Sequence, residues 1–279
     1  MAVDHYENFP VASILLPRPL RTAVRDIYRY ARSADDIADE GNAPNRERLM
    51  QLGQYRSELH RIGADQHGFG PGMPELSHIF DPLRQTIAKH QLPITPFFDL
   101  LSAFEQDIIQ TRYVTFAELS DYCERSANPV GRLMLHLHDA ATPDRFAQSD
   151  AICTGLQLVN MWQDVRVDGM KGRIYLPQED MDRFGVTETD LQARKLTPEW
   201  AALMNFEIER TRALLHFGAP LARTLPGRVG FELRLVVQGA LRILERIESV
   251  NYDVFMNRPT LGRSDWGRML WRATFTYDT

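Results

Sequence analysis

The pattern of apolar residues predicts a protein built almost entirely of α-helices. Apolar side chains recur at spacings of three and four along most of the chain, whereas alternating β-branched runs bounded by turn residues are nearly absent. Pro129 predicts a kink in the fifth helix. The expected helices cover residues 19–41, 45–62, 75–90, 94–109, 116–140, 147–168, 199–215 and 231–250. The predicted fold class is therefore all-α.

The composition is that of a globular protein with one domain. The chain has 279 residues, of which 44% are hydrophobic and 25% charged, and no long linker rich in glycine, serine or proline interrupts it. We therefore expect a single domain over residues 1–279. The 37 acidic residues exceed the 32 basic ones and give a net charge of −5, which argues against a nucleic-acid partner.

The cysteines and the apolar segments indicate the compartment. Cys123 and Cys153 are too few for a disulfide framework, which is typical of a reducing environment. Residues 1–8 lack the basic and apolar pattern of a secretory signal. The apolar stretch 229–244 contains 3 charged residues and is too short to span a bilayer. We expect a cytoplasmic protein, and the sequence leaves a peripheral contact with the inner membrane open.

Four polar residues near the end of the first expected helix share one face. Tyr28, Arg32, Asp35 and Asp39 are spaced i, i+4, i+7 and i+11, so at about 100° per residue they form a first stripe about 60° wide. An acidic last turn is unexpected, because carboxylates there face the negative end of the helix dipole at a cost of about 0.3–1 kcal/mol each. A solvated helix face shows the same pattern, so this stripe alone does not decide its role.

A second stripe of the same kind favours a functional site over a solvated helix face. Gln157, Asn160, Asp164 and Asp168 are spaced i, i+3, i+7 and i+11 on a helix whose other residues are mostly apolar. We expect both acidic pairs to be buried. At about 4 Å and an effective dielectric constant near 20, two like charges repel by on the order of 4 kcal/mol, so such pairs need a cation.

The donor types in the stripes point to magnesium and a diphosphate. Carboxylate and amide oxygens without histidine or cysteine select a hard ion, and Mg²⁺ prefers one or two carboxylates together with water and phosphate oxygens. Donors for those phosphate oxygens lie in or near the stripes. They are Tyr28, Arg32, Lys171, Arg173 and Tyr175. Ordinary surface charge is the alternative, above all for Lys171.

Three motifs resemble the squalene and phytoene synthase family of head-to-head prenyl synthases along nearly the whole chain. The segments Y-R-Y-A-R-S-A-D-D-I-A-D-E and G-L-Q-L-V-N-M-W-Q-D-V-R-V-D-G-M-K-G-R-I-Y-L-P-Q-E-D look like the two aspartate-rich signatures of that family. Between them, F-A-E-L-S-D-Y-C-E-R-S-A-N-P-V-G-R-L resembles a third family segment. The opening E-N-F-P-V-A-S and the segment S-A-N-P-V-G-R-L look most like the bacterial hydroxysqualene synthases of the hopanoid pathway.

The resemblance implies an isoprenoid-synthase helical bundle in which the two stripes face each other across a central cavity. It implies Mg²⁺ ligands at Asp35, Asp39, Asn160, Asp164 and Asp168. It implies contacts to the diphosphate or to bound water from Tyr28, Arg32, Gln157, Lys171, Arg173 and Tyr175, and a substrate contact from Ser13. The four aspartates and Tyr122, which the third motif brings to the cavity, are the implied catalytic residues. Gln163 stands where many phytoene-type members carry a basic residue, and this difference leaves the substrate open.

The implied function is the magnesium-dependent conversion of presqualene diphosphate to hydroxysqualene, with water as the nucleophile. One alternative is the head-to-head condensation of farnesyl or geranylgeranyl diphosphate to presqualene diphosphate, squalene or phytoene. Another is a non-catalytic assembly factor, which the presence of both acidic pairs disfavours. The implied partners are a prenyl diphosphate substrate and other enzymes of the squalene pathway, and no nucleic acid.

Overall fold

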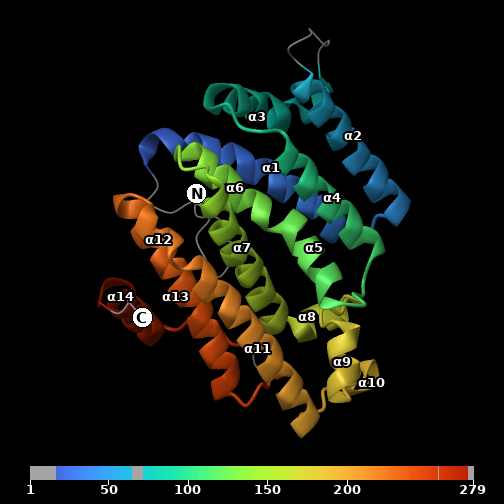
Figure 1. Cartoon of the computed structure of the whole chain (residues 1–279). Coiled ribbons are helices and arrows are strands. Elements are labelled where there is room, and N and C mark those ends of the chain that lie inside the picture. The colour runs from blue at the N-terminus through green and yellow to red at the C-terminus, as the bar shows by residue number, and fades with distance from the viewer. Residues whose placement is uncertain (1–16, 65–71, 257, 276–279) are drawn as a thin grey trace. The chain divides into compact units, whose positions relative to one another are not determined.

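The computed structural model describes residues 17–64, 72–256 and 258–275, and every regular element in these ranges is a helix (Figure 1). The all-α prediction is confirmed. The contacts group the described residues into two compact units. The N-terminal unit comprises residues 17–111 and 121–146, and the C-terminal unit comprises residues 112–120 and 147–275. No helix among the described residues is long and apolar enough to cross a membrane.

The N-terminal unit is built from α1 to α4, which pack together, and α6, which packs against α4. These helices are α1 (Arg21–Asp39), α2 (Asn45–Gly63), α3 (Ser77–His90), α4 (Thr95–Ile109) and α6 (Asn128–Leu137). Short 3-10 turns at Arg18–Leu20 and Pro74–Leu76 precede α1 and α3. Two further helices, α5 (Phe116–Ser126) and α7 (Pro143–Gln163), contribute residues to both units.

The C-terminal unit contains the remaining helices. They are α8 (Val165–Met170), α9 (Gln178–Phe184), α10 (Glu188–Gln192), α11 (Pro198–Gly218), α12 (Leu221–Thr224), α13 (Gly227–Ser249) and α14 (Arg263–Phe275). The sequence analysis did not predict α9, α10, α12 or α14. Three of them have 4 to 7 residues, which is too short for an apolar period to emerge.

Two expected helices are interrupted in the structure. The helix expected over 116–140 with a kink is instead two helices, because Pro129 starts α6 in the first turn, where its missing N–H costs nothing. The helix expected over 147–168 starts at Pro143 and breaks at Asp164, which precedes α8 with φ −104° and ψ 13°. The predicted single helix under the second stripe is therefore wrong.

Tyr30 is the centre of the N-terminal core. Its side chain is fully buried, its hydroxyl donates to the carbonyl of Phe97 at 2.8 Å, and its ring meets the edges of Phe80 and Phe97 at centroid distances of 5.8 and 5.5 Å. Burial raises the pKa of Tyr30, so the hydroxyl keeps its proton. Because Tyr30 lies two residues from both Tyr28 and Arg32, about 200° around the helix, the core turns the first stripe outward.

The C-terminal end of α1 is closed by a side chain from the next helix. Arg48 on α2 is 8% exposed, and its guanidinium donates to the carbonyls of Ile37, Ala38, Gly41 and Ala43 at 2.6–2.9 Å. These bonds place a cation at the negative end of α1, whose own last turn has no basic residue. The acidic end of α1 is therefore compensated from α2.

In the C-terminal unit, an ion pair joins α9 to α11. Arg210 bonds Asp180 at 2.8 Å and Glu207 at 3.2 Å, and its guanidinium lies over the ring of Phe116 at 4.0 Å. Burial raises the pKa of Glu207 to about 8. The ion pair between Arg210 and Asp180 holds α9 against α11. The loop that carries Lys171 and Arg173 leads directly into α9.

We expect Arg48→Ala to lower the free energy of unfolding by about 1–3 kcal/mol, because it leaves several α1 carbonyls without a donor. Urea unfolding of the two proteins measures the difference. Arg46→Ala, at an exposed position of the same helix, is the matched control and should change the value by less than about 0.5 kcal/mol. Equal losses in both variants would show that Arg48 does not close α1.

Candidate active site

The first stripe lies on one partly exposed face of α1. Tyr28, Arg32, Asp35 and Asp39 all have intermediate exposure, while the buried residues of α1 pack into the core on the other side. The four residues therefore form one continuous polar surface of the N-terminal unit. Their roles in binding remain predictions.

Arg32 bonds one acidic residue of this stripe and two acidic residues that flank it. Its guanidinium lies 3.0 Å from Asp35, 2.6 Å from Asp36 and 3.6 Å from Glu40. The side chain of Asp35 is 37% exposed, so the expectation of a buried acidic pair is wrong for this stripe. Solvent and Arg32 together offset the repulsion that burial would have made costly.

The second stripe keeps its spacing across the helix break. Gln157 and Asn160 lie on α7, Asp164 stands between the helices and Asp168 lies on α8. The amide of Asp164 donates to the carbonyl of Asn160 at 2.9 Å, and the amide of Asp168 donates to that of Asp164 at 2.9 Å. The i to i+4 hydrogen bonds thus continue through the interruption, and all four side chains are partly exposed.

Arg258 is bonded to Asp164 and was not predicted as a site residue. Its Nε and Nη2 atoms donate to the two carboxylate oxygens of Asp164, the second at 2.9 Å. Beside this pair, the buried Gln163 donates to the carbonyl of Pro259. A polar residue at position 163 thus serves to fasten the segment 258–259 to the end of α7. Nothing local in the sequence signals a partner 94 residues away.

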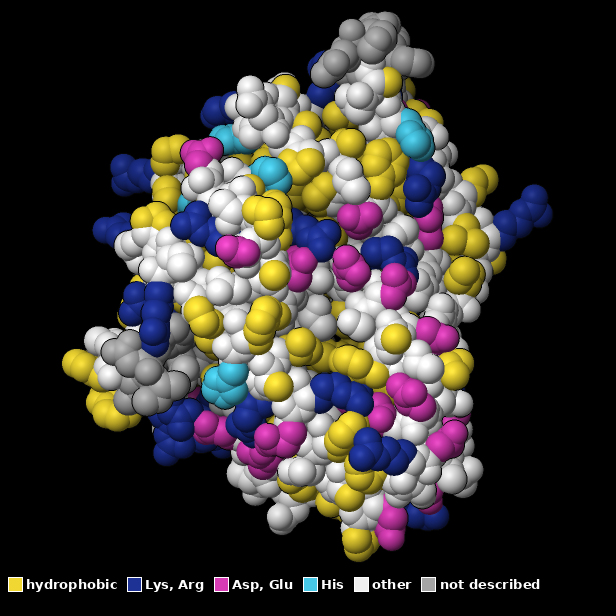
Figure 2. Space-filling view, viewed as in Figure 1, with side chains coloured by type: hydrophobic (Ala, Val, Ile, Leu, Met, Phe, Trp, Pro, Cys, Tyr) yellow, Lys and Arg dark blue, Asp and Glu magenta, His cyan; other side chains and the backbone are white. Residues whose placement is uncertain are grey.

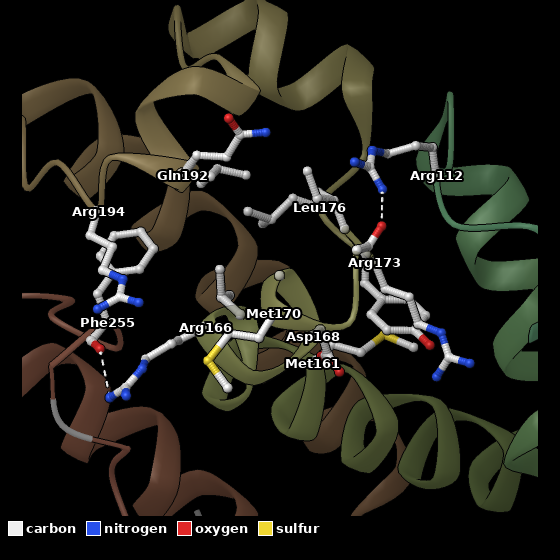
Figure 3. Close-up of a pocket in the computed structure, with 16 residues that line it drawn as sticks. Arg112, Met161, Arg166, Asp168, Met170, Arg173, Leu176, Gln192, Arg194 and Phe255 are labelled. Carbon is white, nitrogen blue, oxygen red and sulfur yellow. Dashed lines mark hydrogen bonds between the residues drawn. The ribbon is translucent and has the colours of Figure 1, made fainter. Parts of the chain in front are cut away.

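A cavity of about 250 Å³ in the C-terminal unit contains three of the predicted residues. Asp168, Arg173 and Tyr175 line it, together with the arginines Arg112, Arg166 and Arg194, which the sequence analysis missed. In Figure 3, Arg112 and Arg173 lie on one side of the cavity and Arg166 and Arg194 on the other. The exposed Lys171 is outside this lining.

Arg112 fixes the loop that follows α8. It donates to both carboxylate oxygens of Glu188 at 2.7 and 2.8 Å and to the carbonyl of Gly172 at 2.6 Å. Its pair with Glu188 raises the pKa of Arg112 and lowers that of Glu188, so both stay charged. The neighbouring Tyr113 stacks on Tyr175 at a centroid distance of 5.8 Å.

Tyr122 is held inside the N-terminal unit. It is 3% exposed, and its hydroxyl donates to the buried carboxylate of Asp107 at 2.8 Å. This bond fixes the direction of the hydroxyl, and the predicted catalytic role of Tyr122 remains a prediction. Ser13 lies outside the described residues.

The donors of the two stripes fit magnesium better than a softer ion. In the described part of the chain, no three histidine, cysteine, aspartate or glutamate side chains gather into a closed metal site. The stripes instead offer carboxylates and two amides, without histidine or cysteine. Such partial oxygen sets suit Mg²⁺, which keeps positions for water and phosphate oxygens.

Comparison with known proteins gives concordant results. The model of the family described as squalene/phytoene synthase matches residues 2–266. A hydroxysqualene synthase of Rhodopseudomonas palustris is 35% identical over 245 residues, which cover 87% of this chain and 80% of that protein. A phytoene synthase of Arthrospira platensis is 29% identical, over 97% of this chain and 88% of the relative. The crystal structure of squalene synthase HpnC from Alicyclobacillus acidocaldarius has a TM-score of 0.80 and 36% identity, and the match covers 90% and 91% of the two chains.

We expect Arg258→Gln to lower the free energy of unfolding in EDTA by about 1–3 kcal/mol, because it leaves a partly buried Asp164 without its cation. Addition of Mg²⁺ should raise the free energy of unfolding of the Arg258→Gln variant by more than it raises that of the wild type. Arg228→Gln, at an exposed position of α13, is the control. Thermal unfolding with and without Mg²⁺ measures both effects, and identical behaviour of the two variants would contradict the assignment.

Proposed function

The chain belongs to the squalene/phytoene synthase family, as its motifs predict, and we propose that it is a magnesium-dependent enzyme that converts presqualene diphosphate to hydroxysqualene. The observation that carries the proposal is the pair of acidic stripes, each of which has two carboxylates one helical turn apart and an arginine bonded to one of them. The likeness to a hydroxysqualene synthase supports this product over others of the family.

We propose that both stripes take part in the binding of metal and diphosphate. Asp35 and Asp39 would hold Mg²⁺ from one stripe, and Asn160, Asp164 and Asp168 from the other. When bound, Mg²⁺ neutralises charge on the diphosphate and so makes it a better leaving group.

The basic and phenolic residues bind the diphosphate in this proposal. Arg32 suits the role because its planar guanidinium already bonds oxygen atoms at 2.6 and 3.0 Å and accepts phosphate oxygens in the same geometry. Arg173 and Tyr175 contribute from the cavity wall. The remaining contacts come from Tyr28, Gln157 and Lys171. Arg112 is a positioning residue, because its bond to Gly172 holds the loop between Lys171 and Arg173.

The reaction consumes one water and needs no change of oxidation state. The carbon–oxygen bond to the diphosphate breaks and both electrons leave with the diphosphate. The cyclopropylcarbinyl cation that remains rearranges, a water oxygen bonds to the rearranged cation, and the water gives up one proton to solvent or diphosphate. The chain's task is to shield the cation and admit one water, so access to the cavity selects the product.

Two other functions are distinguishable from this one. Condensation of two prenyl diphosphates is the first, and the phytoene synthase of Arthrospira platensis favours it at 29% identity. A non-catalytic assembly factor is the second, and the retained acidic pairs of both stripes disfavour it. The proposed conversion to hydroxysqualene is supported by the hydroxysqualene synthase of Rhodopseudomonas palustris, which is more similar to this chain at 35% identity.

We expect Asp39→Asn and Asp164→Asn each to lower turnover of presqualene diphosphate at saturating Mg²⁺ by at least about 100-fold, because charge stabilisation of the leaving group is mostly electrostatic. Folding should survive, since both side chains are partly exposed. Asp182→Asn, at an exposed position of α9, is the matched control and should retain full activity. Near-normal rates in both stripe variants would refute the metal assignment.

Incubation with presqualene diphosphate in ¹⁸O-labelled water, without any nicotinamide, should yield an alcohol that carries the label. Mass spectrometry of the product measures the incorporation. Addition of NADPH should leave the product unchanged, because water ends the reaction. Squalene that forms only with NADPH, or presqualene diphosphate that accumulates from farnesyl diphosphate without further conversion, would contradict the proposal.

A further inference from the structure

The C-terminal helix α14 is fastened to α13 by one of its faces. Asp265 is 1% exposed and lies 2.6 Å from both Arg242 and Arg246. These bonds hold the pKa of Asp265 well below its usual range, so the carboxylate stays charged. Met269 and Ala273 are buried on the same side. The orientation of α14 about its own axis is therefore fixed.

The remaining surface of α14 exposes four large apolar side chains. Trp266 is 43% exposed, Leu270 45%, Trp271 56% and Phe275 70%. At about 100° per residue these four side chains span roughly half of the helix circumference. Single exposed apolar residues are common on protein surfaces, whereas four large ones on one short helix mark an interaction surface.

Basic side chains accompany this apolar surface. Arg263 and Arg268 of the same helix are exposed, and Figure 2 shows hydrophobic and basic side chains close together in the region of α14. Tryptophan prefers the boundary between headgroups and acyl chains, because its ring is apolar and its N–H is polar. Arginine next to it pairs with anionic headgroups. The combination fits a lipid surface in both its apolar and its charged components.

We propose that α14 is a membrane-docking helix that lies in the interface of an anionic bilayer, with Trp266, Leu270, Trp271 and Phe275 at the boundary of headgroups and acyl chains. Its 13 residues extend about 20 Å, less than the hydrocarbon thickness, so the helix lies along the surface. The net charge of −5 repels an anionic surface as a whole. Binding therefore depends on the local arginines and weakens with salt.

The choice of a bilayer as the partner rests in part on the proposed function. Presqualene diphosphate carries long apolar chains, and the loss of diphosphate leaves an alcohol that is almost insoluble in water. A helix seated in the interface would keep the enzyme next to the phase that stores both molecules.

The tryptophans of the chain allow a direct test. The sequence contains 4 of them; Trp162 and Trp200 are buried, so a change in emission on lipid binding reports on Trp266 and Trp271. Without substrate, phosphatidylglycerol-rich vesicles should shift the emission of the full-length protein to shorter wavelength and carry the protein down on sedimentation. Pure phosphatidylcholine vesicles should bind more weakly by at least about 10-fold.

Two sets of variants separate the contributions of the helix. Trp271→Asp combined with Phe275→Asp should weaken vesicle binding by at least about 10-fold. Phe217→Asp, at a phenylalanine of α11 that is 62% exposed, is the matched control and should bind as the wild type does. Arg263→Gln combined with Arg268→Gln should weaken binding to anionic vesicles and reduce its dependence on salt.

The outcomes distinguish this proposal from its competitors. An emission shift that appears on raising the protein concentration without vesicles would assign α14 to a contact between two copies of the chain. No shift in either condition, or equal losses in the Phe217→Asp control, would refute the docking helix. Turnover of presqualene diphosphate in detergent micelles should be the same in the α14 variants and the wild type. Vesicle binding without turnover would overturn the proposed function and leave the docking helix standing.

Discussion

Two carboxylates one helical turn apart repel each other, and in each acidic stripe an arginine bonds one carboxylate of the pair. Arg32 serves the first stripe from within the same helix. Arg258, 94 residues further along the chain, bonds Asp164 of the second stripe. A third arginine, Arg48, removes the added conflict between the acidic end of α1 and its dipole. The acids are thus partly exposed and lie beside side chains that are themselves able to bind phosphate oxygens.

The features that the sequence predicted are those set by local periodicity. The face that Tyr28, Arg32, Asp35 and Asp39 share follows from 3.6 residues per turn, and the structure keeps it. The longer helices follow from apolar spacing in the same way. The family followed from the motifs, because their residue types and order are more specific than any single acidic turn. Short helices such as α10, with 5 residues, are too brief to show a period.

The features that the sequence did not predict depend on contacts between distant residues. In the sequence, nothing near Arg48 or Arg112 distinguishes them from surface arginines. In the structure, Arg48 bonds the end of α1 and Arg112 bonds the loop after α8. The exposure of Asp35 was misjudged because apolar neighbours on a helix indicate one buried face, and the acids occupy the other. The break at Asp164 is invisible in the periodicity because the backbone hydrogen bonds continue across it.

The bond between Asp164 and Arg258 also bears on how the protein acquires its site. It closes a loop of 94 residues, as does the neighbouring bond from Gln163 over 96 residues. Loop closure of this length carries an entropic cost that only the packing of α9, α11 and α13 in between can offset. This entropic cost has to be met before contacts of such high sequence separation add stability. Asp164 therefore gains its arginine only after residue 258 has been synthesised and has packed beside the end of α7, and a nascent chain that ends before residue 258 lacks this partner for the carboxylate.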